Sequence, residues 1–402
     1  MPETNRARRA APRRTASRRP ALRVVAPDER PAGRPQDRSV RLLMVSTASL
    51  VLIGLAMVLS ASSVAAYDRF GSSFLFFNRQ AAYAVVGALF LRVAMRMRYQ
   101  AWQRLSVPFL VVTGALLVVV LLPGIGTVAG GSARWLSLGP VTVQPSEIAK
   151  LALVVFGATL LTRRLKHVHE PRAVLIPLAV VVAGVGGLIL LQPDMGTAVI
   201  LLASAFSLAF AAGARLRHLA AAAGAAATLG FAAIYTEAYR WARFVSFLNP
   251  WGDPQGDGYQ TIQSLIGLGS GGLFGVGLGA SRQKWLYVPN AHTDFIYSII
   301  GEELGLLGAL LVLGLFATLV YAGVRIALRA PDTFGRLLAT GITAWLGLQA
   351  VINLGAVTGL LPITGVPLPF VSFGGSSLVV SMAAVGVLAS IGRAGRKRAR
   401  TA

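Results

Sequence analysis

The sequence predicts an all-α polytopic membrane protein with about ten transmembrane helices. Three observations support this. The 402-residue chain is 55% hydrophobic and 13% charged, with a mean hydropathy of +0.65, values typical of membrane proteins. Apolar runs recur that are near the ~20 residues a bilayer needs. Basic residues collect in every second loop, as the positive-inside rule requires.

The remaining composition excludes several classes of function. The chain has no Cys, so disulfides and thiolate metal sites are excluded. A net charge of +23 would suggest nucleic acid for a soluble protein. Here the basic residues lie in the tails and in the short loops of one side, so we expect no nucleic-acid partner. The chain has four His residues, and three of them fall in the basic loops, so no His-built metal site is expected.

The chain divides into three parts. Residues 1–41 are rich in Arg, Pro and Ala, which predicts a disordered basic cytoplasmic tail. Residues 42–393 hold the apolar runs and form the transmembrane domain, and residues 394–402 form a second basic cytoplasmic tail. The expected spans are Leu42–Ser62, Phe74–Ala94, Leu105–Leu122, Ile148–Thr162, Ala173–Leu191, Thr197–Ala212, Leu216–Tyr235, Phe295–Tyr321, Leu337–Leu360 and Ser376–Ile391.

The loops between these spans alternate in charge. With the N-terminal tail inside, every inner segment is basic: Arg92–Arg104, Arg163–Arg172, Arg215–His218, Arg325–Arg336 and Arg393–Arg400. Most outer loops carry fewer Arg and Lys residues. This pattern predicts that both termini are cytoplasmic, with a large outer loop, Thr236–Asp294, between the seventh and eighth spans.

The outer loops are also where Gly and Pro gather. The segments are Gly130–Lys150, Gln192–Thr197, Arg243–Gln260 and Gly359–Ser377. Non-helical backbone at membrane depth is tolerated only against protein or a wet cavity. The four segments therefore predict a roofed cavity on the outer face.

One stretch, Gly267–Gly305, concentrates the unusual residues. A glycine-dense run leads to Arg282 and Lys284, then to Asp294, and then to an apolar helix that carries two adjacent carboxylates. Carboxylates inside an apolar helix are costly and mark function by default. The rest of the chain can be interpreted as the scaffold that presents this stretch.

Elimination by predicted location leaves few acids for catalysis. Glu147 and Lys150 lie three residues apart on one helix face, and we interpret them as an internal ion pair ahead of a catalytic role. Asp194 stands at a helix break, where it could cap the next helix or contact a ligand. Glu302 and Glu303 are interpreted first as packing or proton-balancing groups inside the bundle.

Asp294 is the sharpest catalytic candidate. The structural alternative is an acid in the first turn of a helix, which the helix dipole favours. Ser298, Gly301 and Gly305 would lie on nearly the same helix face as Asp294. Small residues there let a neighbouring helix approach or leave room for a substrate. Spacing alone leaves both roles open.

Four basic residues fall on the outer face, against the charge rule. They are Arg134, Arg243, Arg282 and Lys284. Arg and Lys pair strongly with phosphate oxygens, so a pyrophosphate site would explain them. Side chains that extend from helix ends to the membrane interface would explain each of them equally well.

At five places the motifs resemble those of the SEDS family, over residues 42–393. The matching strings are R-W-L-S-L-G with Q-P-S-E-I-A-K, Q-P-D-M-G-T, G-L-G-A-S-R-Q-K, A-H-T-D-F-I-Y-S-I-I-G-E-E-L-G and L-P-F-V-S-F-G-G-S-S. The family is known as multi-pass peptidoglycan glycosyltransferases that polymerise lipid II together with a class B penicillin-binding protein. The resemblance implies the same activity here, with release of undecaprenyl diphosphate.

The resemblance also implies site residues. Asp294 stands where the family has its catalytic aspartate, in H-T-D-F. The expected substrate-binding residues are Arg134, Gln144, Ser146, Glu147, Lys150, Asp194, Arg243, Arg282, Lys284, His292, Thr293, Ser372 and Ser376. No metal ligand and no cofactor is expected, and a divalent cation, Mg²⁺ or Mn²⁺, is left open. Family members commonly carry Glu where this chain has Asn290, so no role for an acid is expected at that position.

Within the family, short details favour the division member over the elongation member. They are Gly258-Tyr259-Gln260, Ser270-Gly271-Gly272 and Met57–Ser63. This implies a plasma-membrane protein at the division septum, with its active site outside and a septal transpeptidase and other divisome proteins as partners. An elongation-type polymerase, a lipid II flippase and a non-catalytic scaffold remain the alternatives.

Overall fold

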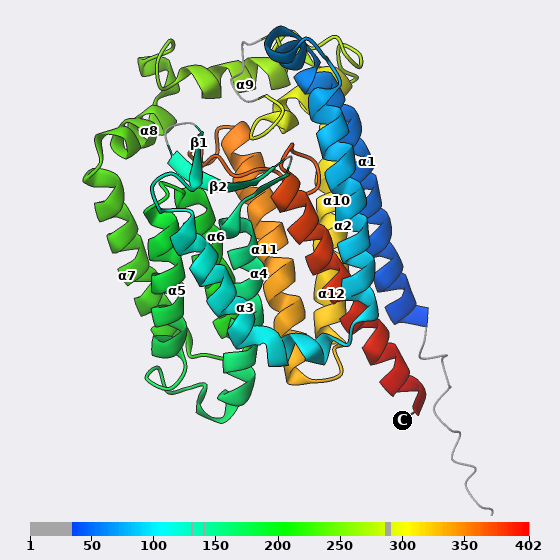
Figure 1. Cartoon of the computed structure of the whole chain (residues 1–402), viewed down its shortest axis with the longest axis vertical. Helices are drawn as coiled ribbons and strands as arrows, with labels where there is room; N and C mark the ends of the chain where they lie inside the picture. The colour runs from blue at the N-terminus through cyan, green and yellow to red at the C-terminus, as the bar shows by residue number, and fades with distance from the viewer. Residues whose placement is uncertain (1–33, 130–131, 140, 286–290, 402) are drawn as a thin grey trace, which may run out of the picture.

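The computed structural model describes residues 34–129, 132–139, 141–285 and 291–401 (Figure 1). The predicted disorder of residues 1–33 and the departure at Asn290 lie outside the described residues. The helices are α1 (Arg34–Phe70), α2 (Leu75–Arg96), α3 (Tyr99–Val119), α4 (Pro145–Arg163), α5 (Leu175–Leu190), α6 (Met195–Ala211), α7 (Leu216–Tyr235), α8 (Ala238–Leu248), α9 (Tyr259–Ser270), α10 (Ile296–Leu328), α11 (Thr333–Val357) and α12 (Gly375–Thr401). Two short 3₁₀ turns are η1 (Leu165–His167) and η2 (Pro250–Gly252).

Each of the ten expected spans is helical, but the helices differ in length and polarity. Among the described residues, seven helices are long and apolar enough to cross a membrane: α1, α3, α4, α7, α10, α11 and α12. The apolar helices α5 and α6 are shorter. Helix α2 is less apolar because it carries Arg79, Arg92 and Arg96. The chain is thus a multi-pass membrane protein, and the count of ten spanning helices stays a prediction.

Two helices run into the expected tails. Helix α1 already begins at Arg34, and α12 continues to Thr401. Pro35 suits a first helical turn because its missing N–H would have no partner there. Arg, Lys and Ala are strong helix formers, which explains why the helix continues past the apolar part of α12. Helicity in these basic segments follows from propensity, which hydropathy does not measure.

The all-α prediction missed a small antiparallel sheet. Strands β1 (Gly126–Ala129), β2 (Ser132–Leu138) and β3 (Val141–Val143) pair in the order β1-β2-β3, with Thr127 opposite Trp135 and Ser137 opposite Thr142. The signal was present in the alternation of V-T-V after a Gly-Pro turn. It was masked because the surrounding chain is apolar and helical.

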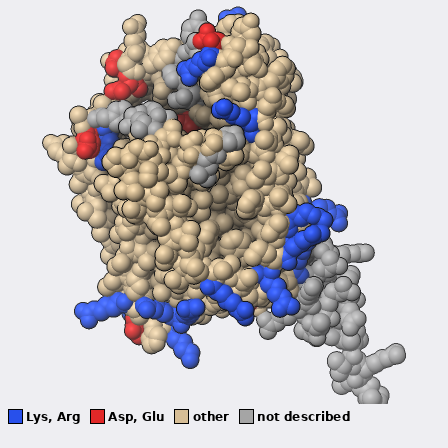
Figure 2. Space-filling model, viewed as in Figure 1, with Lys and Arg blue, Asp and Glu red and all other residues tan. Residues whose placement is uncertain are grey.

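The sheet, α8 and α9 lie at one end of the bundle, which we call the loop end (Figure 1). The start of α1 and the end of α12 lie at the opposite end (Figure 1). Lys and Arg side chains gather at that opposite end on the face in Figure 2, and the band between the two ends carries almost no charge. This distribution is the one that the positive-inside rule gives for a protein with both termini in the cytoplasm.

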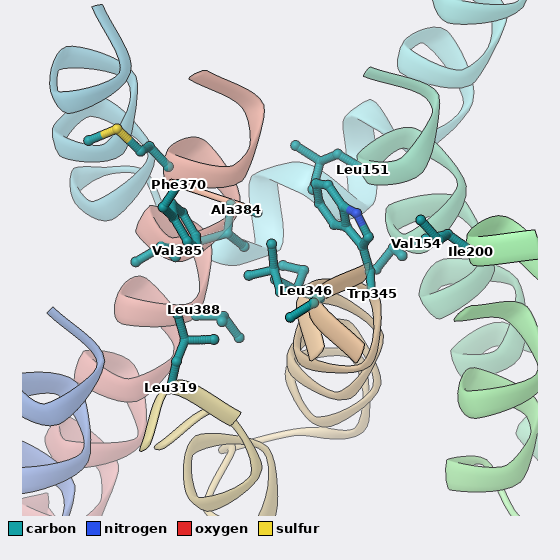
Figure 3. Close-up of a cluster of buried hydrophobic side chains, with 14 of the residues drawn as sticks. Leu151, Val154, Ile200, Leu319, Trp345, Leu346, Phe370, Ala384, Val385 and Leu388 are labelled. Carbon is teal, nitrogen blue, oxygen red and sulfur yellow. The ribbon is translucent and has the colours of Figure 1, made fainter. Parts of the chain in front are cut away.

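The bundle core is built where α4, α6, α10, α11 and α12 meet. Trp345 and Leu346 of α11 are fully buried there against side chains from the neighbouring helices (Figure 3). Phe370, from the segment before α12, packs into the same cluster (Figure 3). The segment between α11 and α12 is therefore anchored in the core, so it offers a fixed backbone at the loop end.

Helix α10 is broken at Gly305, whose φ of 68° and ψ of −166° are non-helical. A segment that we call the glycine loop, residues 271–285, folds against the break. Before the break, the carbonyls of residues 302 and 303 accept from the amides of residues 276 and 277, at 2.9 and 3.1 Å. After the break, the amides of residues 306 and 307 donate to the carbonyls of residues 272 and 273, at 2.9 and 3.2 Å. The loop thereby satisfies the backbone groups that the break sets free, as membrane depth demands.

Candidate active site

Asp294 lies just before α10, and three segments meet at its backbone. The side-chain amide of Asn353, on α11, donates to the carbonyl of Asp294 at 2.8 Å and to the carbonyl of Val366 at 2.8 Å. Asn353 is 2% exposed. Because one buried amide holds both carbonyls, the start of α10 and the segment between α11 and α12 are fixed relative to each other.

A small cavity of about 10 Å³ lies beside the Asp294 carboxyl, lined also by Asn353, Thr364 and Gly365. It has room for about one water molecule. Gly365 has a φ of +70°, and a Cβ there would stand 3.5 Å from Oδ2 of Asp294. Within the described residues, Oδ1 of Asn353 and Oγ1 of Thr364 are buried without a hydrogen-bond partner. Buried polar atoms without partners indicate a place for water or a substrate hydroxyl.

The surroundings of Asp294 change its acidity. Burial raises the pKa of Asp294 to about 6. The positive charges of Arg243 and Arg134 and a hydrogen bond from Thr293 lower this pKa, while the negative charge of Asp194 raises it. Arg282 and Lys284, which are nearer to Asp294 in the sequence, are not among the charges that change this pKa. A carboxyl with a pKa near 6 is ionised at neutral pH and can accept a proton.

Arg134 and Asp194 are brought to this site by a second set of contacts. Arg134, on β2, donates to the carbonyls of Gln192 and Pro193 at 2.8 and 2.6 Å. Asp194 follows directly and caps α6, accepting from the amide of Thr197 at 3.1 Å. The sheet thus holds the turn between α5 and α6. Capping, one of the two roles left open for Asp194, is confirmed.

A sequence profile describing a cell cycle protein family that comprises FtsW, RodA and SpoVE matches residues 40–397. The chain belongs to the FtsW/RodA/SpoVE family. Stage V sporulation protein E of Bacillus subtilis is 44% identical over 356 residues, covering 88% of this chain and 97% of that protein. A probable peptidoglycan glycosyltransferase FtsW of Geobacter sp. strain M18 is 42% identical, covering 87% and 95%.

Solved structures agree with this assignment. The chain matches one from a structure titled as the coordination of polymerization and crosslinking by a peptidoglycan synthase complex, with a TM-score of 0.73, 32% identity, and coverage of 88% of this chain and 97% of that chain. RodA of Thermus thermophilus gives a TM-score of 0.65 at 29% identity, with coverage of 87% and 95%. The chain is a glycosyltransferase of the FtsW/RodA/SpoVE family.

Three polar side chains link the sheet to the helix bundle: Gln144, Ser146 and Ser376. The side-chain amide of Gln144 donates to Ser146 Oγ at 3.1 Å, and Ser146 Oγ donates to Asp194 Oδ2 at 3.5 Å. The hydroxyl of Ser376 accepts from the backbone amide of Gln144 at 2.9 Å and donates to the carbonyl of Thr142 at 3.2 Å. These hydrogen bonds form a chain that runs from the sheet through Gln144 and Ser146 to the carboxylate of Asp194.

Glu147 and Lys150 form the ion pair that their spacing predicts. Nζ of Lys150 lies 2.8 Å from Oε2 of Glu147, and both side chains are 1% exposed. Nζ also donates to Oε1 of Gln349 at 2.7 Å and lies 5.3 Å from the ring centre of Trp345. In this structure the pair ties α4 to α11, so any contact with substrate would require these bonds to open.

Glu302 and Glu303 hold the glycine loop. Glu302 accepts from the hydroxyl of Ser281 and from the amide of Arg282, the latter at 2.9 Å. The carboxylate of Glu303 accepts from the hydroxyl of Ser60, on α1, which lies 2.6 Å from Oε1 and 2.8 Å from Oε2. The bonds give these acids a structural role, the one we placed first.

Lys284 and Arg282 lie on the same loop but in different surroundings. Lys284 is 7% exposed, and its ammonium donates to the carbonyl of Gly279. Arg282 is exposed. Neither residue is among the charges that act on Asp294. Their expected contact with substrate therefore stays a prediction.

His292 and Thr293 directly precede Asp294 in the chain, and Ser372 lies in the segment between α11 and α12. The His292 ring lies 4.7 Å from the ring of Phe76 and 5.7 Å from that of Phe373, between centroids. Burial and then the charge of Arg69 lower the pKa of His292 to about 4, so it is neutral at physiological pH. Ser372 is buried, and its hydroxyl accepts from the amide of Leu368 at 2.8 Å. The backbone amide of Phe373 donates to the carbonyl of His292 at 2.9 Å, which joins the segment before Asp294 to the segment before α12.

Our prediction from the sequence missed Asn353 and Thr364. A signal existed, because Asn353 is a polar residue inside the expected span Leu337–Leu360, and such residues pair inside the bundle. The sequence could not show that its partner would be Asp294. Within the described residues, no three His, Asp or Glu side chains are grouped to hold a metal ion.

Proposed function

We propose that this protein polymerises lipid II into glycan strands at the division septum, with release of undecaprenyl diphosphate. One observation carries the proposal: Asp294, a half-buried residue whose carboxyl has a pKa of about 6, stands at the loop end of an apolar bundle, near two arginines. Glycosyl transfer needs a base and charge stabilisation, and this arrangement can supply both. Family relatives named as peptidoglycan glycosyltransferases support it.

Asp294 acts as the general base. The 4-hydroxyl of the acceptor GlcNAc attacks C1 of the donor MurNAc and gives its proton to the carboxylate. A C–O bond forms at C1, and the bond from C1 to the phosphate oxygen breaks. The electron pair of that bond leaves with the diphosphate. A sugar hydroxyl is a poor nucleophile at neutral pH, so the base is needed as the bond forms.

Arg243 and Arg134 stabilise the departing diphosphate. Both exert a positive charge at Asp294, so a diphosphate beside that carboxylate would feel the same charges. Arg134 already donates to two backbone carbonyls, which holds its guanidinium in place before substrate arrives. Fixed charge at the position where negative charge develops is the most effective electrostatic contribution to catalysis.

The active site faces the outside of the plasma membrane. The gathering of the basic segments at the end opposite the sheet, α8 and α9 supports this orientation (Figures 1 and 2). A class B penicillin-binding protein, the septal transpeptidase, is the expected partner, together with other divisome proteins. The match to a chain of a peptidoglycan synthase complex supports such a partner.

Polymerisation of lipid II by the purified chain, co-purified with its penicillin-binding protein, tests the proposal. Asp294→Asn keeps the shape of the side chain and removes the base, so the rate should fall by ~10²–10⁴. Association with the partner should survive. A normal rate in Asp294→Asn would overturn the mechanism.

The rival activities give different results. A flippase would move lipid II across vesicles without making polymer, and a scaffold would be insensitive to Asp294→Asn. Depletion in cells separates the subtypes: filaments or chains of cells support the septal role. Loss of width control with normal septation would indicate the elongation role.

A further inference from the structure

A second cavity, of about 210 Å³, lies between α8 and α9 at the loop end. Phe247 of α8, the 255–257 turn and Tyr259 and Gln260 of α9 line it. Ligand pockets for drug-sized molecules begin at about 300 Å³. This cavity is smaller, so it suits one ring of a larger ligand.

The cavity adjoins the Asp294 site. Ile363 lines both this cavity and the small cavity beside Asp294. Arg243 lines the larger cavity, and its Nη1 lies 3.5 Å from the carbonyl oxygen of Ile363. Among the cations, Arg243 has the largest effect on the pKa of Asp294. A ligand that reacts at Asp294 could therefore extend past Ile363 into the larger cavity.

The lining has the chemistry that recognises a neutral sugar. Gln255 and Gln260 offer side-chain amides, Ser246 and Tyr259 offer hydroxyls, and Phe247 offers an aromatic ring. Amides and hydroxyls both donate and accept, as sugar hydroxyl and acetamido groups require. Aromatic rings supply an apolar surface for the carbon face of a pyranose. The lining carries one positive side chain, Arg243, and one negative side chain, Asp257, and the Asp257 carboxylate disfavours a diphosphate in this cavity.

The wall of the cavity is formed in advance. The carboxylate of Asp253 accepts from the amide of Gly256 at 3.0 Å and from the amide of Asp257 at 3.3 Å. The carbonyl of Asp253 accepts from the amide of Gly258 at 3.1 Å. A Cβ at Gly258 would stand 2.0 Å from the carbonyl oxygen of Pro250, so only glycine fits. A preformed wall loses less entropy when a ligand binds.

We propose that this cavity is a subsite for one N-acetylated sugar ring of the glycan, next to the rings that react at Asp294. The inference rests on the proposed polymerase function and adds to it a second point of contact with the strand. Such a contact keeps the growing strand bound between successive additions. It therefore governs product length rather than the first condensation.

Matched variants of α9 test the subsite. Gln260→Ala removes an amide from the cavity, whereas Gln263→Ala removes the same group from the same helix outside the lining. With purified complex and lipid II, Gln260→Ala should shorten the glycan strands and leave the initial rate of joining two lipid II molecules unchanged. Gln263→Ala should give strands of normal length. Gln255→Ala, on the exposed turn, is a second cavity variant that spares α9.

A binding measurement tests the sugar subsite separately from the proposed polymerase function. The probe is a lipid-free GlcNAc–MurNAc tetrasaccharide, with its contacts to the full-length protein measured by saturation-transfer NMR. Gln260→Ala should weaken its binding roughly 3- to 10-fold, the loss expected for one hydrogen bond, and inorganic pyrophosphate should not displace it from this cavity. Normal strand length and normal affinity in both cavity variants would overturn the subsite. Failure of the wild-type complex to make polymer would instead overturn the proposed function.

Discussion

At the scale of single residues, the chemistry of this protein depends on how Asp294 is held. Its carboxyl has a pKa near 6 because burial opposes ionisation more than Arg243 and Arg134 favour it. Its backbone is fixed by Asn353, which also fixes Val366. A base whose pKa lies near the working pH is both ionised and strong enough to accept a proton.

The raised pKa predicts an acid limb in the activity profile. Below pH 6 the Asp294 carboxyl is neutral and cannot accept a proton, so kcat/KM should fall about tenfold per pH unit below 6 and level off above it. The pH dependence of lipid II polymerisation measures this. The small residual activity of Asp294→Asn should show no such limb. A limb that persists in this variant would assign the titration to another group.

Asn353 is predicted to be a positioning residue. Asn353→Leu removes the N–H donors that hold Asp294 and Val366 without adding a charge, so kcat should fall roughly tenfold or more, with a smaller change in KM. A released Asp294 would also be better solvated, so the acid limb should move below pH 6. Steady-state kinetics at several pH values test both effects. If only the thermal midpoint falls and the limb stays in place, Asn353 is merely structural.

At the scale of elements, the broken helix α10 and the glycine loop form one unit. The break leaves backbone groups without helical partners, and the loop supplies those partners. Glu302 and Glu303 add side-chain bonds to the same loop and to α1. Ser298, which we expected beside Asp294 with Gly301, donates instead to the carbonyl of Ser264, on α9. The small residues thus let α9 approach α10.

Glycine at the break is predicted to be irreplaceable. Gly305 occupies a backbone region that is nearly restricted to glycine, and a Cβ there would stand 2.4 Å from the amide nitrogen of Gly275. Gly305→Ala should destabilise the fold by roughly 2 kcal/mol or more. Gly314→Ala, on the same helix with no atom near the added Cβ, should be neutral or stabilising. Thermal unfolding in detergent compares the two. Equal midpoints would show that the break is not a fixed feature of α10.

At the scale of the whole molecule, the charge pattern of the sequence and the arrangement of the helix bundle indicate the same orientation of the protein in the membrane. The basic segments gather at one end, and the sheet, α8 and α9 lie at the other (Figures 1 and 2). The candidate site belongs to the second end, because Arg134 of β2 and Arg243 of α8 act on Asp294. In this orientation the candidate site would face away from the cytoplasm. The apolar band between the two ends matches what a bilayer requires.

Topology can be measured directly because the chain has no Cys of its own. We expect Pro254→Cys to react with a membrane-impermeant thiol reagent added to whole cells whose outer barriers are open. Glu170→Cys should react only after the plasma membrane is permeabilised. Both positions are exposed, so access within the protein does not limit labelling. Labelling of both from the same side would refute the topology with both termini inside.

Most of the helical fold could be predicted from the sequence, and part of the site. Ten apolar runs became helices, and Asp294, Arg134, Arg243 and Asp194 gather near one another as the outer-face assignment implied. The sheet, α8 and α9 were missed because each element is too short to give the long apolar signal that marks a span.

The sequence by itself determined the membrane class, the helical segments and the family, because hydropathy, charge and motifs are properties of short stretches of chain. Only the tertiary structure decided which groups act on Asp294. Arg243 and Asn353 are 51 and 59 residues away along the chain, and Arg282, 12 residues away, is not among those charges. Electrostatic and hydrogen-bond energies depend on distance through space, and the packing of the helices sets that distance.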